Sequence, residues 1–344
     1  MSCDRGSLDA YAKPPESLRT VFKKYQHMKT EELDADEDIL DFAKKAVGQQ
    51  EKAFRSDIAY ENSYLSTVLD PFVGRSVHGA HDDLRRYESV DVPGLTIIPF
   101  CLPLEVQSIL LSRLLHRDLS NPAHKTNVHF HHDVPYPPPS TSFFSFPPSS
   151  DLAFPPLSNE HKPFSLPAFL NKKLRWVTLG GQYDWTLKRY PTESPPEFPK
   201  DVGGLVEGLF PEMKAQAAIV NFYSPGDTLS MHRDVSEECD RGLVSVSLGC
   251  DGLFVIGFDA EGEGLKGTKH VVVRLRSGDA VYMEGKARFA WHGVPKVIAG
   301  TCPEALKNWP ACNVPSESEV SSHEHWKGWL ENKRINLNVR QMRD

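Results

Sequence analysis

The segment "NFYSPGDTLSMHRD" (221–234) ends on His232 and Asp234, two residues whose side chains can both bind a metal ion. In an extended strand, residues two apart face the same way, so the imidazole and the carboxylate can point into one cavity. They are two of the three ligands of the 2-His-1-carboxylate facial triad, which holds non-haem Fe(II) and leaves coordination positions open. The pair alone is a weak indication, because a chain with 14 histidines contains such spacings by chance.

A facial triad needs a second histidine, which the fold must supply from another segment. His292 in "FAWHGVPK" is the best candidate, because it lies at the end of a predicted strand. The segments "HFHHD" and "HEH" contain alternatives, although both lie in polar, loop-like stretches where histidines are usually solvated. These alternatives are His129, His131, His132, His323 and His325.

The segment "RINLNVR" (334–340) alternates polar and apolar residues, which predicts a strand with one polar face. That face carries Arg334, Asn336, Asn338 and Arg340. Such a face is normally the solvated side of a sheet. Two arginines on one face also suit a small dicarboxylate, because a guanidinium binds a carboxylate in a bidentate manner that lysine cannot reproduce. An Fe(II) site beside such a pocket is what a 2-oxoglutarate oxygenase requires.

The elements that must position these residues are mostly strands. From Arg175 onward, short segments rich in β-branched residues are separated by Gly, Pro and Asp turns, which favours an antiparallel sandwich or jelly roll. The preceding segment 92–115 predicts a short strand followed by a helix that begins at Pro103. We therefore predict a mainly β (α+β) catalytic domain over residues 92–344 with flanking helices.

Two other regions differ in composition. Residues 14–54 show helical periodicity, so we expect residues 1–91 to form a helical N-terminal extension. Residues 136–167 are rich in Pro, Ser and Phe and lack a periodic apolar pattern. They predict a long loop, inserted outside the catalytic core.

Composition limits the cellular setting. The chain has 344 residues, 40% hydrophobic and 25% charged, and no apolar run approaches the roughly 18 residues of a membrane-spanning helix. The N-terminus lacks a secretory pattern, and the six cysteines form no C-x-x-C pair. We expect a monomeric intracellular protein with reduced thiols, in the nucleus and/or cytoplasm. The net charge of −7 argues against a broadly basic nucleic-acid-binding surface.

Four segments taken together resemble the AlkB family of Fe(II)- and 2-oxoglutarate-dependent dioxygenases: "NFYSPGDTLSMHRD", "SVSLG", "SGDAVYMEGKARFAWHGVP" and "RINLNVR". The resemblance covers about residues 174–342. Within it, "LRWVTLGGQYDWTLKRYP" (174–191) is similar to the eukaryotic AlkB homologue-one branch. The resemblance implies a double-stranded β-helix fold, in agreement with the strand pattern.

The resemblance also implies roles for individual residues. His232, Asp234 and His292 would bind Fe(II). The residues implied to bind 2-oxoglutarate are Asn221, Tyr223, Arg334, Asn336 and Arg340. Asn338 stands where the family usually has threonine, which raises the question of how the residues beneath the pocket pack.

The implied reaction uses O2 and 2-oxoglutarate, releases succinate and CO2, and removes a methyl group from a base as formaldehyde. The substrate would be methylated DNA and/or tRNA, with roles in DNA repair or tRNA modification. The base must leave its stack and be held between aromatic rings. Trp176, Tyr183 and Trp185 lie where AlkB relatives place a nucleotide-recognition lid, although they could equally be core aromatics of a strand.

A basic cluster flanks these aromatic residues and could contact phosphates, or it could be an ordinary solvated face. Its members are Lys172, Lys173, Arg175, Lys188 and Arg189.

Three other functions fit parts of the sequence. A protein hydroxylase or demethylase could use the same metal and cosubstrate motifs, which do not encode the substrate. A catalytically silent binding module is disfavoured because no metal ligand or cosubstrate arginine is missing. A zinc hydrolase would leave the paired arginines unexplained.

Overall fold

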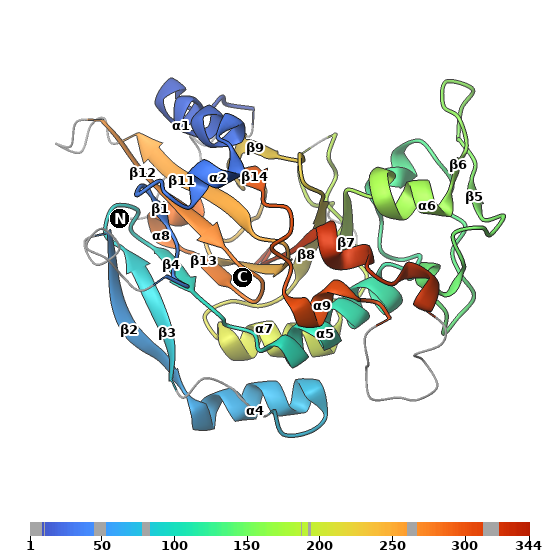
Figure 1. Ribbon diagram of the computed structural model, residues 1–344, viewed down its shortest axis with the longest axis horizontal. Helices are drawn as coiled ribbons and strands as arrows, with labels where there is room; N and C mark the ends of the chain where they lie inside the picture. The colour runs from blue at the N-terminus through green and yellow to red at the C-terminus, as the bar shows by residue number, and fades with distance from the viewer. Residues whose placement is uncertain are drawn as a thin grey trace.

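The computed structural model describes residues 9, 11–44, 53–77, 83–186, 188–191, 194–259, 267–311 and 323–344. Two β-sheets form the centre of the molecule, and helices lie around them (Figure 1). This arrangement confirms the predicted mainly β architecture with flanking helices.

The larger sheet has the strand order β2-β3-β4-β13-β10-β15-β8-β7, and its neighbouring strands run antiparallel. Its strands are β2 (Phe54–Glu61), β3 (Asp83–Ser89), β4 (Leu95–Ile98), β7 (Trp176–Gly180), β8 (Ala217–Tyr223), β10 (Leu243–Gly249), β13 (Ala280–Met283) and β15 (Arg334–Arg340).

The smaller sheet has the order β1-β12-β11-β14-β9. Its strands are β1 (Ile39–Leu40), β9 (Leu229–His232), β11 (Gly252–Asp259), β12 (Thr268–Leu275) and β14 (Trp291–Val297). β1 runs parallel to β12, whereas the pairs β11–β12, β11–β14 and β14–β9 are antiparallel.

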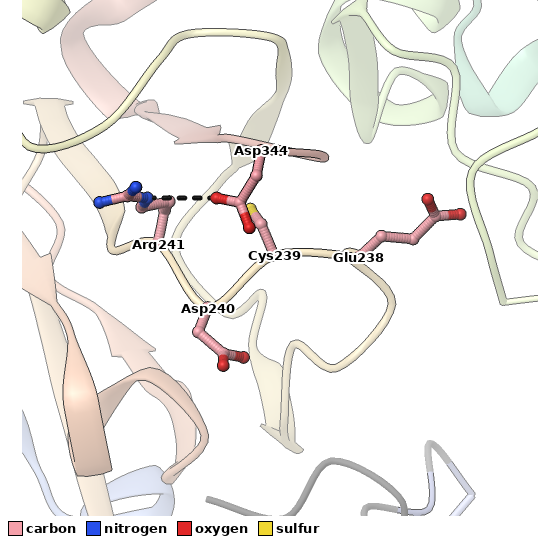
Figure 2. Close-up of a pocket in the computed structure, with 5 residues that line it drawn as sticks. All are labelled: Glu238, Cys239, Asp240, Arg241 and Asp344. Atoms are coloured by element: carbon pink, nitrogen blue, oxygen red, sulfur yellow. Dashed lines mark hydrogen bonds and ion pairs between the residues drawn. The ribbon is translucent and has the colours of Figure 1, made fainter. Parts of the chain in front are cut away.

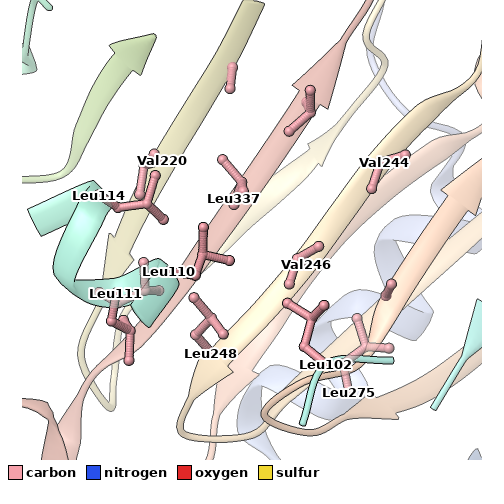
Figure 3. Close-up of a cluster of buried hydrophobic side chains, with 14 of the residues drawn as sticks. Leu102, Leu110, Leu111, Leu114, Val220, Val244, Val246, Leu248, Leu275 and Leu337 are labelled. Carbon is pink, nitrogen blue, oxygen red and sulfur yellow. The ribbon is translucent and has the colours of Figure 1, made fainter. Parts of the chain in front are cut away.

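The larger sheet buries its apolar face against a helix. The predicted helix is α5 (Leu104–Ser112), which continues into the π-helical turn η2 (Arg113–Asp118). Figure 3 shows Leu110 and Leu114 beside Val220 and Leu337 on this face. Side chains alternate along a strand, and Leu337 faces the helix. The polar residues of β15 therefore face the smaller sheet.

The described part of the N-terminal region contains the predicted helices and, in addition, three strands. The helices are α1 (Glu16–His27), α2 (Thr30–Leu33) and α4 (Asn62–Val73), and α1 packs on the smaller sheet through Leu18, Phe22 and Tyr25. Of the strands, β1 extends the smaller sheet, while β2 and β3 extend the larger one. Residues 45–52, also predicted to be helical, lie outside the described residues. The domain boundary at residue 92 stays a prediction.

Residues 136–167 are not separate from the core, which corrects the sequence-based expectation. The segment contains a short turn η4 (Phe143–Ser145) and a hairpin of β5 (Ala153–Phe154) and β6 (Phe164–Ser165). Its Phe143, Phe144 and Phe154 are completely buried and belong to the main hydrophobic cluster. Sequence periodicity missed them because isolated phenylalanines between prolines form no repeating face.

The remaining helices are short. They are η3 (Asn127–Phe130), α6 (Leu166–Ala168), η5 (Phe169–Lys173), α7 (Lys200–Leu209), α8 (Gly285–Arg288), α9 (Glu304–Lys307), η6 (Glu324–Trp326) and η7 (Trp329–Asn332). Among the described residues, no helix is both long and apolar enough to span a membrane. Cys101, Cys239, Cys250 and Cys302 are buried, and none of these four forms a disulfide with a described residue.

Candidate active site

Three potential metal ligands meet at the edge of the smaller sheet. The ligand atoms of His232, Asp234 and His292 all lie within 4.8 Å of one another. His232 Nε2 is 3.5 Å from Asp234 Oδ1, and His292 Nε2 is 4.0 Å from Asp234 Oδ2. Two imidazoles and a carboxylate at this spacing can bind one divalent ion such as Fe(II). In the described part of the chain, this is the single group of its kind.

Strand pairing brings the two histidines together. β9 ends at His232 and pairs with β14, and the register sets His232 directly opposite His292. Asp234 follows in the loop that leads to β10. The structure therefore places His292, which the sequence favoured, beside the His232–Asp234 pair.

The five alternative histidines lie outside this cluster. Their neighbours are other rings or turns: His129 contacts Tyr136, His131 and His132 contact His161, His323 stacks on His116, and His325 lies in η6. They supply no ligand to the group formed by His232, Asp234 and His292.

Backbone carbonyls fix the orientation of both histidine rings. Nδ1 of His232 lies 3.0 Å from the Ser230 carbonyl oxygen, and Nδ1 of His292 lies 3.1 Å from that of Ala290. A carbonyl can only accept, so each Nδ1 carries a proton and Nε2 is the nitrogen of each ring that can bind a metal ion. A hydrogen bond of this kind on the far nitrogen is typical of metal-binding histidines.

The charge state of the cluster also suits a cation. Burial lowers the pKa of His292 to about 4, so its ring is neutral at neutral pH. Burial alone would raise the pKa of Asp234, but Arg340 and the two histidines outweigh it and hold that pKa well below its usual range. Burial likewise opposes the charged form of His232, yet Asp234 raises its pKa. The Asp234 carboxylate thus stabilises a proton on His232, and a bound metal ion would take the place of that proton.

A row of polar side chains lies on the face of the larger sheet that is turned towards this cluster. Register pairs Tyr223 with Arg334 and Asn221 with Asn336, and residues paired directly across two strands share a face. Arg340 lies on the same face of β15, at its other end. The structure therefore groups all five residues predicted to bind the cosubstrate.

Arg334 has buried hydrogen-bonding capacity that the described residues leave unused. The residue is 2% exposed, and its Nη2 donates to Ser247 Oγ at 2.9 Å. Its Nε and Nη1, and the buried hydroxyl of Tyr223, have no hydrogen-bond partner among the described residues. Burial raises the pKa of Tyr223 to about 12, so the hydroxyl remains a donor. Buried polar groups are normally paired, and these donors together suit a carboxylate.

Gly252 makes room for this arginine. A Cβ on Gly252 would lie 2.7 Å from Arg334 Nε and 3.0 Å from its Cδ. A side chain at the start of β11 would therefore displace the guanidinium. The sequence offered no indication of this contact, because it joins two sheets.

A buried charge network surrounds Asp234. Arg340 Nη2 lies 3.4 Å from Asp234 Oδ2, and Arg340 Nη1 donates to Glu237 Oε1 at 3.0 Å. Arg288 binds the other oxygen of Glu237 at 2.7 Å and donates to the backbone carbonyl of Asp234 at 2.7 Å. Arg288 lies in α8, just before the strand that carries His292, so it ties the Asp234 loop to that strand. Sequence reasoning missed both Arg288 and Glu237, whose only signal was their closeness in sequence to the ligands.

Asn338, which stands where the family usually has threonine, has a partner for each end of its side-chain amide. With its amide oriented to satisfy its surroundings, its oxygen accepts from Arg340 Nη2 at 3.0 Å and its nitrogen donates to the Val244 carbonyl at 3.3 Å. The residue thus supports Arg340 from two positions earlier in the same strand, β15.

The predicted lid aromatics contact one another. Trp176 stacks on Trp185 with ring centres 5.0 Å apart, and Tyr183 meets Trp185 edge-on at 4.8 Å. Register places Trp176 opposite Asn221, on the face of the sheet that bears the polar row. The Tyr183 hydroxyl lies 3.2 Å from Ser236 Oγ, two residues beyond Asp234. Trp185 is 38% exposed, so this group lies at the rim of the site rather than in the core.

The basic cluster divides into exposed and paired members. Lys172 and Lys173 are exposed at the end of η5. Arg175 forms an ion pair with Asp227 at 2.5 Å, and Lys188 lies over the Tyr11 ring at 3.7 Å. Arg189 is exposed and pairs through its backbone with Asp184.

A separate surface cavity of about 390 Å³ lies at the loop that follows Asp234 and leads to β10 (Figure 2). It is lined by Glu238, Cys239, Asp240, Arg241 and Asp344. Arg241 and Asp344 form an ion pair at 3.3 Å across it, and Cys239 Sγ bonds to the Gln341 carbonyl. None of the predicted site residues lines this cavity.

Comparisons with known proteins extend the resemblance seen in the sequence. Residues 151–340 match the 2OG-Fe(II) oxygenase superfamily. A protein of Pyricularia oryzae named "N6-methyladenosine RNA demethylase ALKB1" is 47% identical over 100% of both chains. A Schizosaccharomyces pombe protein named "tRNA demethylase abh1" is 40% identical, over 75% of this chain and 82% of that protein. An Arabidopsis thaliana protein named "DNA N(6)-methyladenine demethylase ALKBH1A" is 33% identical over 50% of each chain.

The family match spans more than half of the 344 residues, and one relative is similar along its full length. The chain therefore belongs to the 2OG-Fe(II) oxygenase superfamily, in the AlkB homologue-one branch, and is a 2-oxoglutarate-dependent dioxygenase.

Proposed function

We propose that this enzyme removes methyl groups oxidatively from bases of nucleic acid, using Fe(II), 2-oxoglutarate and O2. The observation that carries the proposal is the pairing of a His-Asp-His cluster, in which His292 is buried and the other two residues are partly buried, with the buried donors of Arg334 and Tyr223 that have no partner among the described residues. The names of relatives that act on RNA, tRNA and DNA support nucleic acid as the substrate class.

His232 and His292 would bind the iron through Nε2, and Asp234 through its carboxylate. Their fit to the metal rests on the fixed Nδ1 hydrogen bonds and on the buried Asp234 Oδ2, which has no hydrogen-bond partner among the described residues. When bound, the iron and cosubstrate supply the oxidation of a methyl group, with release of succinate, CO2 and formaldehyde.

Arg334 and Tyr223 would bind the distal carboxylate of 2-oxoglutarate, because their buried donors converge where a carboxylate can accept them. Asn221, Asn336 and Arg340 would complete the pocket. Asn336 is itself held by bonds to Ser245 Oγ and the Val246 carbonyl, so its side chain is fixed before the cosubstrate binds.

Trp176, Tyr183 and Trp185 would hold the target base and keep water away from the reacting methyl group. Lys172 and Lys173, with Arg175, would contact the phosphates on either side. A monomer acting in the nucleus and/or cytoplasm completes the proposal.

A substrate panel tests it. The full chain, with Fe(II), 2-oxoglutarate and O2, is incubated with N6-methyladenosine RNA, methylated tRNA, N6-methyladenine DNA and a methylated histone peptide. Formaldehyde from one or more of the nucleic acids, in step with succinate, is expected. Formaldehyde from the peptide alone would replace this proposal with the protein demethylase.

A further inference from the structure

A continuous series of ring contacts leads from the metal-ligand loop to the surface beyond the lid. The series, here called the aromatic ridge, consists of Tyr183, Trp185, Trp176, Phe130, His131 and His161. Beyond the lid, Phe130 meets Trp176 edge-on at 5.7 Å, and His131 lies beside Phe130 at 6.3 Å and packs on His161 at 4.3 Å. The outer part of the ridge thus continues the lid without a break.

The outer ridge is exposed although it is aromatic. Phe130 is 50% exposed, and His131 is also exposed. Phe130 contacts Trp176, which stacks on the exposed Trp185, and contiguous exposed apolar groups of this kind mark binding surfaces. α6, β5 and β6 form a lobe beside β7, so the ridge passes from the sheet onto this lobe (Figure 1).

The backbone that carries Phe130 is held firmly. Thr126 caps η3 through its hydroxyl, which accepts from the Val128 amide. Asn127 donates to the Lys173 carbonyl at 2.8 Å and accepts from the Arg175 amide at 2.8 Å. Because Asn127 links η3 directly to η5 and β7, the Phe130 ring is positioned before any ligand arrives.

Positive charge lies at the outer end of the ridge. His161 contacts His132, whose ring lies 4.6 Å from Phe164, and Lys173 Nζ lies 5.9 Å over Phe164. Exposed Lys172 precedes Lys173 in the chain. Rings beside lysines are the combination that single-stranded nucleic acid binds, by stacking of bases and pairing of phosphates.

We propose that Phe130, His131 and His161 bind nucleotides that flank the target base in single-stranded nucleic acid. This inference rests on the proposed function and adds the form of the substrate and its path. A single strand is required because the bases of a duplex are stacked on one another and cannot stack on protein rings. The track runs from the lid, over Phe130, towards Lys173.

The test measures binding of single-stranded RNA with one N6-methyladenosine, by fluorescence anisotropy with Fe(II) and 2-oxoglutarate under anaerobic conditions. One oligonucleotide has four flanking nucleotides on each side, and two others are trimmed to one nucleotide on the 5′ or the 3′ side. Wild type should lose affinity on trimming one side and not the other. Phe130→Ala should bind the full oligonucleotide about tenfold more weakly, which corresponds to about 1.4 kcal/mol of lost stacking.

Two control variants separate stacking from damage to the lobe. Phe130→Tyr keeps the ring and should keep wild-type affinity. Tyr64→Ala removes an exposed aromatic ring on α4, far from the ridge in sequence and outside its contacts, and should also bind as wild type. One of the two trimmed oligonucleotides should bind wild type more weakly, because it lacks the nucleotides that stack on Phe130. Phe130→Ala should bind that oligonucleotide as tightly as wild type does.

Equal affinities of wild type and Phe130→Ala for every oligonucleotide, with demethylation intact, would overturn the ridge and leave the proposed function standing. A wild-type protein that neither binds nor demethylates any of the three RNAs, nor their DNA counterparts, would overturn both.

Discussion

At the scale of single residues, Arg334 is the side chain whose surroundings demand a ligand most clearly. It is almost completely buried, yet two of its nitrogens have no partner among the described residues. An unpaired buried charge is strongly destabilising, so a fold keeps one mainly where a ligand will meet it. The alternating pattern of "RINLNVR" predicted this residue, whereas its contacts with Ser247 and Gly252, which lie on other strands, could not be predicted from the sequence.

Arg334→Lys should raise the KM for 2-oxoglutarate about tenfold or more, because an ammonium group cannot bind a carboxylate in a bidentate manner. Succinate release measured against 2-oxoglutarate concentration checks this. Arg117→Lys, at an arginine that pairs with Asp118 and Asp201 away from the site, is the matched control and should leave the KM unchanged. An unchanged KM in Arg334→Lys would mean that the polar face of β15 has no cosubstrate role.

Lys333 gives a pH-dependent prediction. Its Nζ is buried between the Asn171 carbonyl and Ser224 Oγ, and burial lowers the pKa of Lys333 to about 8, against a smaller opposing effect of Asp227. The unfolded chain therefore binds more protons than the folded protein between about pH 8 and 10.5, so stability should rise with pH in that range. Because the pKa of Lys333 is about 8 in the folded protein and 10.5 in the unfolded chain, the rise is on the order of 3 kcal/mol.

Chemical denaturation at pH 8 and 10.5 checks this prediction, with Lys333→Met as the comparison. The variant should lose the part of the pH-dependent rise that Lys333 contributes. Identical pH profiles for the two proteins would show that the lysine stays fully charged in the folded state.

At the scale of elements, the sequence predicted the strands better than their partners. The short β-branched segments of the C-terminal half became β8 and β10–β15, because alternation and turn residues mark them directly. It missed β2 and β3 as members of the larger sheet, since strands with exposed polar residues, such as Arg55 and Asp57 of the edge strand β2, lack the apolar alternation. The Pro-rich segment was predicted to lie outside the core because its buried phenylalanines are isolated in the sequence and form no periodic pattern.

Phe144→Ala should destabilise the whole catalytic domain by about 3–5 kcal/mol, because the ring is completely buried against Trp309 and Trp329 at 5.1 and 5.0 Å. Leu157→Ala is the matched control in the same segment: it is 63% exposed and should change stability by less than about 0.5 kcal/mol. Urea unfolding measures both. A small effect of Phe144→Ala would restore the expectation that residues 136–167 are dispensable to the fold.

At the scale of the whole molecule, an acidic protein must bind a polyanion. The net charge of −7 is spread over the chain, whereas Lys172 and Lys173 lie together at the outer end of the aromatic ridge. Local positive charge beside the site is enough for phosphate contacts, because charges beyond about 8–10 Å are largely screened at physiological salt.

The double variant Lys172→Glu/Lys173→Glu should weaken binding about equally for methylated and unmethylated strands, because phosphate contacts do not specify sequence. It should also reduce the slope of log Kd against log salt by about 1.4, from two lost contacts on a single strand. Lys200→Glu/Lys214→Glu, at exposed lysines of α7 and the turn after it, is the control. A salt slope that is flat in wild type would remove the basic track and favour a protein substrate.

The most direct test of the account is to measure formaldehyde and succinate from one N6-methyladenosine RNA, for wild type and for Asp234→Ala. Asp234 lies between both histidines and Arg340, and a site with two ligands cannot hold the iron as three do. The proposed iron site predicts equal amounts of the two products from wild type, and neither from the variant, although the variant keeps the circular dichroism spectrum of the folded protein. Formaldehyde release that persists in Asp234→Ala, or that needs no 2-oxoglutarate, would contradict it.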